Sequence, residues 1–375
     1  ALFTSYGTDY FFLSELVRGS PAAARPRGVT VVDNYDHHRT PSGLDEATYT
    51  PSNEAVGCHF SVVLPPFFDD GAAAADRTRV HHGTMHPKLW LLAFDAGGLC
   101  GRGFLRLVIS SANLGRYDAR INNQFWVCDF VRSDDAGAAV QQLSESELKA
   151  ELEERGVNCD ALYEEGAREM SEWRAELVEA RRRDSAEFGS DLRLFVRRLL
   201  QPAAPELHEL WADLLDQYEL APPPGTHLIL TAPGRYSLTK ETERAGVKDA
   251  ELYGQAALRR HLRADLHGRA MKAGRRPTLV EFACSSLGDL RGPYSILQTL
   301  MNVLPNGEQR TGERLDRGAF LTEAEYGAKA KLLWPTLAVS LPAFARGQGL
   351  LTIGGGKHTM TGPSDLKCRQ LKHCM

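Results

Sequence analysis

Short apolar runs of strand type alternate with amphipathic helical segments along this chain, and this alternation limits its fold more than any other feature. The strand candidates are rich in Val, Ile, Leu or Phe and are bounded by Gly, Pro, Asn or Asp. The mixture predicts a layered α/β fold. The expected strands cover residues 29–34, 59–64, 87–94, 104–110, 124–130, 226–231, 278–284 and 331–334, and the expected helices cover 9–17, 191–201, 208–218 and 252–266.

The composition is that of an ordinary globular protein. The chain has 375 residues, of which 43% are hydrophobic and 25% charged, and this length favours two domains. Its 44 basic residues face 48 acidic ones, so the net charge is −4. Proteins that bind nucleic acid without specificity usually carry a basic excess. Any contact with DNA is therefore expected in a local groove. Seven scattered cysteines without a C-x-x-C pair favour a reducing compartment.

Residues 144–183 differ from the rest of the chain because they are dense in Glu, Arg and Ala. Many opposite charges stand three or four residues apart, which is typical of ion pairs along a helix. We interpret this segment as a solvated helical insertion. The Arg181–Arg183 run can contact phosphates, but a run of like charges is usually a solvated face. A domain boundary is expected between residues 185 and 225.

The segment HHGTMHPKLWLLAF, residues 81–94, carries the most informative motif. Side chains alternate along an extended strand, so His86 and Lys88 are expected on one side, about 7 Å apart. A phosphate can bridge an imidazole and an ammonium at this separation. Neutral imidazole is a competent nucleophile near neutral pH, and an ammonium is purely a hydrogen-bond donor.

A second segment, LRLVISSANL at residues 105–114, is an apolar strand that runs into Ser111 and Asn113. Polar residues at the end of an apolar strand are costly unless they line a site or cap a turn. If the two strands are neighbours, His86, Lys88 and Asn113 can converge on one phosphoryl group. The Asn113 amide would then donate to oxygens whose charge grows during the reaction, and no metal would be required.

The H-x-K motif, followed by an apolar strand and then S-x-N, resembles the first half-site of the phospholipase D superfamily, and specifically that of tyrosyl-DNA phosphodiesterases. The general superfamily motif has an Asp shortly after the Lys, where this chain has Leu92, Ala93 and Phe94. Tyrosyl-DNA phosphodiesterases also lack that Asp. Further segments similar to this family are ALFTSYGTDYFFLSEL, NNQFWV, TAPGRY and CSSLGDL.

The resemblance implies a phospholipase-D-like α-β-α sandwich with two domains related by a pseudo-twofold axis, at 1–190 and 191–375, with an insertion at about 133–186. The family also uses a second H-x-K…N set, and this sequence contains none. The final residues, His373 to Met375, resemble the tripeptide that precedes that second motif. We therefore expect that the chain stops before its second half-site, that its second domain is incomplete, and that it is inactive or stalls after attack.

The resemblance also assigns roles to single residues. His86 would attack phosphorus and form a phosphohistidine, while Lys88 and Asn113 hold the non-bridging oxygens. Gln124 would orient the histidine of the second half-site. Residues implied near the scissile phosphate or the bound strand are Tyr6, His82, Ser111 and Ser286, with His82 at the position where relatives stack an aromatic ring on a base.

The implied function is hydrolysis of a 3′-phosphodiester that joins DNA to tyrosine, as left by a trapped type IB topoisomerase. The implied partner is DNA, single-stranded or at the 3′ end of a duplex, with an attached topoisomerase peptide. No cofactor, metal or membrane is expected, and the complete protein is expected to be a nuclear monomer.

Three other functions remain open at this stage. A metal hydrolase could use His81, His82 and His86, although Gly83 and Pro87 interrupt the helix that such a site would need. A DNA-end-binding scaffold could retain the motif without catalysis. A lipid-cleaving phospholipase D is disfavoured by the missing Asp and by the flanking segments.

Overall fold

The structure is a computed structural model that divides into two compact units. The first unit contains Ala1–Ala119 and Asn123–Tyr236, and the second contains Arg120–Asn122 and Ser237–Met375. Among the described residues, no helix combines the length and the apolar character needed to cross a membrane. The described residues are 1–21, 25–33, 57–65, 86–96, 102–115, 125–159, 170–232, 236–237, 239–244, 246–265, 280–283 and 330–333.

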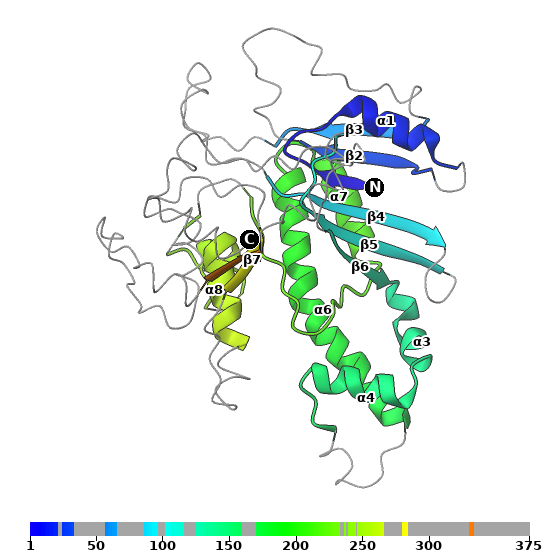
Figure 1. The fold of residues 1–375 in the computed structure, drawn as a ribbon, viewed down its shortest axis with the longest axis vertical. Coiled ribbons are helices and arrows are strands. Elements are labelled where there is room, and N and C mark those ends of the chain that lie inside the picture. The colour runs from blue at the N-terminus through cyan, green and yellow to red at the C-terminus, as the bar shows by residue number, and fades with distance from the viewer. Residues whose placement is uncertain are drawn as a thin grey trace. The chain divides into compact units, whose positions relative to one another are not determined.

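A six-stranded sheet forms the centre of the first unit, with the strand order β3-β2-β1-β4-β5-β6 (Figure 1). The pairs β1–β2 and β2–β3 are parallel, whereas β1–β4, β4–β5 and β5–β6 are antiparallel. This mixed sheet contains the first five predicted strands, each with slightly shifted ends. The strands are β1 (Leu2–Thr4), β2 (Gly28–Val32), β3 (His59–Val63), β4 (Leu89–Ala96), β5 (Arg102–Ser110) and β6 (Phe125–Val131).

Helix α1 (Tyr10–Gly19) covers one face of the sheet over β2 and β3 (Figure 1). Asp9 caps this helix, because its carboxylate accepts a hydrogen bond from the backbone amide of Phe12. Leu13 belongs to the same apolar cluster as Val31 of β2. Burial of this apolar stripe therefore fixes α1 against the sheet.

The opposite face of the sheet is covered by α6 (Met170–Leu200), against which α7 (Pro205–Leu215) packs. Phe130 of β6 points to this face, and its ring centroid lies 5.8 Å from that of Phe188 in α6. Helices on both faces of a sheet make the first unit a layered α/β structure, which confirms the predicted α/β class. The phospholipase-D-like sandwich with two related domains stays a prediction.

Two predicted elements differ from the structure. Residues 226–231 do not form a strand, because only Leu230 makes an isolated bridge there. Leu228 and Leu230 are buried, so their apolar character serves packing rather than strand pairing. The helix predicted at 191–201 is the final part of the much longer α6. The charged first half of α6 lacks the apolar pattern from which one continuous helix would be predicted.

The described part of the second unit contains four helical or strand elements. They include η7 (Asp249–Leu252) and α8 (Gly254–Asp265), where a helix is predicted. The strands β7 (Val280–Ala283) and β8 (Ala330–Leu333) pair in parallel and match two predicted strands. The predicted domains at 1–190 and 191–375 stay predictions. Residue 190 lies inside α6, which belongs to the first unit throughout.

The charged segment is helical where it is described, and its ion pairs Lys149–Glu153 and Glu151–Arg155 have the predicted i,i+4 spacing, but it is not solvated throughout. Its helix α4 (Glu145–Glu154) and the first half of α6, together with the preceding α3 (Ala136–Gln141), enclose an apolar cluster of their own. The cluster forms because large apolar residues described on these helices point inward. Its buried members are Val140, Leu148, Leu152, Cys159, Trp173 and Leu177.

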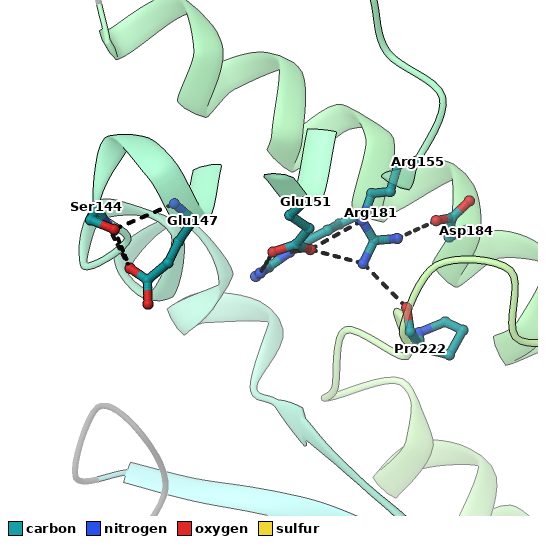
Figure 2. Close-up of polar contacts among 7 residues, drawn as sticks. All are labelled: Ser144, Glu147, Glu151, Arg155, Arg181, Asp184 and Pro222. Atoms are coloured by element: carbon teal, nitrogen blue, oxygen red, sulfur yellow. Dashed lines mark hydrogen bonds and ion pairs between the residues drawn. The ribbon is translucent and has the colours of Figure 1, made fainter. Parts of the chain in front are cut away.

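The ion pairs of this segment connect separate helices in addition to successive turns. Arg155, whose side chain is 4% exposed, donates to Glu151 at 2.9 Å and to the Pro222 carbonyl at 3.2 Å, and it also contacts Asp184 of α6 (Figure 2). Arg181 of α6 donates to Glu151 at 2.6 Å. Burial alone would raise the pKa of Glu151, but its two arginine partners lower it. These contacts fix α4 against α6.

We expect Leu152→Ala to lower the free energy of unfolding by about 2–5 kcal/mol, because it opens a cavity in this apolar cluster. Glu154→Ala, at an exposed position two residues away, is the matched control and should change it by less than about 0.5 kcal/mol. Urea unfolding measures both. Equal effects of the two substitutions would contradict a packed helical segment.

Candidate active site

The motif residues lie at the end of the sheet where the end of β1, the start of β4 and the end of β5 are neighbours; this end is called the edge below. Because β4 is antiparallel to both neighbours, its start lies beside the ends of β1 and β5. The Ser110 amide donates a hydrogen bond to the Lys88 carbonyl oxygen at 2.9 Å, so the ladder continues past the start of β4. This pairing brings the segments that hold His86 and Asn113 to one edge.

His86 and Lys88 precede β4, and their side chains contact each other. Lys88 Nζ lies 2.8 Å from His86 Nδ1 and donates to the His86 carbonyl oxygen at 3.1 Å. Lys88 is buried, with 7% exposure, whereas His86 is exposed. The two side chains lie on the same side. Their nitrogen atoms are 2.8 Å apart, however, and not separated by the spacing of about 7 Å that is expected of an extended strand. Residues 86–88 lie outside the strand, which leaves the ammonium able to fold back onto the ring.

The contact between Lys88 and His86 favours one tautomer of the imidazole. An ammonium group only donates hydrogen bonds, so in this contact His86 Nδ1 is the acceptor. In the neutral ring, the proton then resides on Nε2. Nε2 becomes a nucleophile only after Lys88 leaves Nδ1 and the proton moves there.

The surroundings of His86 favour its neutral form. Desolvation by the protein and, next, the positive charge of Lys88 lower the pKa of His86, and a hydrogen bond with its own backbone opposes them. A lowered pKa increases the fraction of neutral imidazole near neutral pH. The site is therefore suited to nucleophilic or general-base chemistry.

Asn113 follows the end of β5 in a short turn, where its carbonyl oxygen accepts a hydrogen bond from the Gly115 amide at 2.9 Å. Its side-chain Oδ1 is buried and, in the described part of the chain, has no hydrogen-bond partner. A buried amide oxygen without a partner is costly, and a catalytic role or an ordered ion is among the explanations of such a group. The position of Asn113 is therefore consistent with a binding role.

Tyr6 and Ser111 lie around these residues. The Tyr6 ring is next to the His86 ring, with centroids 4.8 Å apart and planes tilted by 34°. This contact restricts the orientation of the imidazole. Ser111 is exposed in the bend directly after β5. Three other predicted site residues, His82, Gln124 and Ser286, lie outside the described residues, as does His81.

Sequence patterns did not identify two further residues at this edge. Thr4 and Ser5 are fully buried, and their hydroxyl groups bond to the segments that carry Lys88 and Asn113. The one available signal was a pair of hydroxyl residues directly before Tyr6, which is too common a pattern to assign a role.

A metal at His86 fits this arrangement poorly. A cation would need a ring lone pair, and Lys88 already occupies that of Nδ1. The ammonium would also repel a second positive charge at this distance. The geometry thus favours chemistry by the side chains over coordination at Nδ1.

A neutral imidazole beside an ammonium donor has the chemistry of a phosphoryl-transfer site, in which the ring attacks and the donor holds an anionic oxygen. Comparison with known families agrees with this class, since the family model described as tyrosyl-DNA phosphodiesterase matches residues 74–342.

The chain belongs to the tyrosyl-DNA phosphodiesterase family, and it is thereby a member of a family of DNA-repair phosphodiesterases. The matched range contains His86, Lys88 and Asn113, whereas Tyr6 precedes it. No curated protein sequence and no solved structure matches the chain.

Proposed function

We propose that this protein hydrolyses the 3′-phosphodiester that joins DNA to a tyrosine side chain, such as the bond left by a trapped type IB topoisomerase. The observation that carries the proposal is the contact of 2.8 Å between Lys88 and His86, which lies within the range that matches the family. It places a neutral imidazole and a buried positive charge together, where a phosphate can meet both.

The proposed reaction begins when a substrate phosphate attracts the Lys88 ammonium away from His86 Nδ1. The ring proton moves from Nε2 to Nδ1, and Nε2 attacks phosphorus. The new P–N bond forms as the bond to the tyrosyl oxygen breaks. The tyrosine leaves as a phenolate, whose conjugate acid has a pKa of about 10 and which therefore leaves more easily than an alkoxide. Lys88 and Asn113 stabilise the non-bridging oxygens. Water hydrolyses the phosphohistidine where a second half-site supplies the base, and without that base the reaction stalls at the adduct.

The family membership supports further parts of the proposal. The substrate is DNA with a protein adduct, single-stranded or at a 3′ end, and the protein acts as a monomer in the nucleus without a metal or cofactor. Gln124 would orient the histidine of a second half-site, which this sequence does not contain, in a phospholipase-D-like pair of domains. The bound strand is contacted by Tyr6, His82, Ser111 and Ser286.

The function can be tested with an oligonucleotide that carries a 3′-phosphotyrosine. Under single-turnover conditions with excess chelator, we expect release of free tyrosine, while phosphatidylcholine stays intact. Tight binding without release would instead indicate a DNA-end-binding scaffold. Release that stops when the chelator is added would indicate a metal hydrolase, and cleavage of the lipid would indicate a phospholipase. Each of these results would contradict the proposal.

A further inference from the structure

Two consecutive hydroxyl side chains are buried where β1 ends, next to the segments that form the candidate active site. Thr4 and Ser5 are each 0% exposed. Burying a hydroxyl group is costly unless it makes hydrogen bonds. Both residues meet this need by bonding to backbone groups of the two segments that carry the motif residues.

Thr4 bonds to the backbone on both sides of Lys88. Its Oγ1 donates to the Pro87 carbonyl oxygen at 3.0 Å and accepts from the Leu89 amide at 2.8 Å. The backbone pairing of β1 with β4 reaches only as far as the pair of Phe3 and Trp90. Beyond that pair, the Thr4 hydroxyl satisfies the Pro87 carbonyl and the Leu89 amide in place of backbone groups of β1.

Ser5 bonds in the same way beside Asn113. Its Oγ accepts from the Leu114 amide at 3.1 Å and donates to the Gly7 carbonyl oxygen at 2.7 Å. Asp9 also donates its amide hydrogen to the Leu114 carbonyl oxygen at 2.8 Å. The residue after Asn113 is therefore tied to the segment that follows β1 through both its N–H and its C=O.

The next residue in the chain completes the arrangement, because Tyr6 lies against the His86 ring. Three consecutive residues thus contact the segments of three motif residues. Thr4 holds the backbone around Lys88, Ser5 holds the backbone after Asn113, and Tyr6 contacts His86. A shift of this short segment would change the positions of all three together.

We propose that Thr4 and Ser5 are positioning residues, which fix the placement of Lys88 relative to Asn113 through the backbone without touching the substrate. This inference rests on the proposed function of the site. Displacement of a catalytic group by about 1 Å can cost on the order of 10²-fold in rate. The effect of losing these hydroxyls should therefore appear in the chemical step more than in DNA binding.

The test compares Thr4→Val, which keeps the side-chain shape but removes both hydrogen bonds, with Thr30→Val as the matched control. Thr30 is a buried threonine of the neighbouring strand β2. We expect Thr4→Val to slow single-turnover release of tyrosine by about 10- to 100-fold, with less than about a threefold change in the Kd of the oligonucleotide. Thr4→Ser should restore most of the rate, and Thr30→Val should leave it unchanged.

A second readout keeps this inference separate from the proposed function. Loss of the Thr4 hydrogen bonds should loosen the contact between Lys88 and His86, so the pKa of His86, measured by NMR titration, should rise in Thr4→Val but not in Thr30→Val. If the wild-type protein does not cleave the substrate, the function fails and the titration alone decides the positioning role. If Thr4→Val does not fold, Ser5→Ala carries the rate and Kd measurements, because it should displace Asn113 and slow tyrosine release without weakening DNA binding.

The inference is overturned if the folded Thr4→Val protein keeps both the wild-type rate and the wild-type titration of His86. It is also overturned if Thr30→Val changes them equally. The second result would show that any polar deletion in this part of the sheet has the same consequence.

Discussion

Replacing His86 by asparagine is expected to lower the single-turnover release of tyrosine from a 3′-phosphotyrosyl oligonucleotide by about 10⁴-fold or more, as when a covalent nucleophile is removed. Asparagine is polar and smaller than histidine, so the variant should fold, but its amide cannot attack phosphorus. The Kd of the oligonucleotide should change little, because Lys88 remains available for the phosphate.

The matched control for this substitution is His59→Asn. His59 is an exposed histidine at the start of β3, away from the edge where the motif lies, and its ring forms a hydrogen bond with the Ser61 hydroxyl. The control should retain the wild-type rate. An His86→Asn protein that stays folded and loses less than about tenfold in rate would show that another group attacks phosphorus.

Replacing Lys88 by methionine is expected to lower the same rate by about 10²–10³-fold, the usual effect of removing one donor that stabilises a developing negative charge. Methionine retains the length and apolar stem of the buried side chain. It also removes a positive charge that lowers the pKa of His86. That pKa should rise, and more of the imidazole should be protonated at a given pH.

The pH dependence of the Lys88→Met protein provides a second measurement. Only neutral imidazole attacks, so activity is lost as the pH falls through the pKa of His86. The acid limb of the rate profile should therefore move to higher pH than in the wild type. Lys149→Met, on α4, is the control and should leave the profile unchanged. A shift of the acid limb to lower pH would contradict the assigned electrostatics.

The sequence was sufficient to predict five of the six strands of the sheet and the location of the motif, but not the order of the strands. His86 and Lys88 are two residues apart, so their proximity is a local property of the chain. Asn113 reaches the same edge because β4 and β5 are adjacent antiparallel strands, and this is a common arrangement for strands close in sequence. Periodicity and apolar runs thus carried most of the information on the first unit.

Long-range hydrogen bonds were not predictable in the same way. Thr4 bonds to residues more than eighty positions away, and no local pattern shows which hydroxyl will meet which backbone group. The burial of Arg155 was also not predictable, because its i,i+4 spacing from Glu151 fits an ordinary solvated helix. Only the packing of α4 against α6 shows that this charge is buried and shared with Asp184.

The most direct test of the account is mass spectrometry of the protein after brief reaction with a 3′-phosphotyrosyl oligonucleotide. The account predicts an acid-labile adduct in which the 3′-phosphate of the oligonucleotide is attached to His86, with one free tyrosine released for each adduct formed. Tyrosine release without any adduct, or an adduct on another residue, would contradict nucleophilic attack by His86.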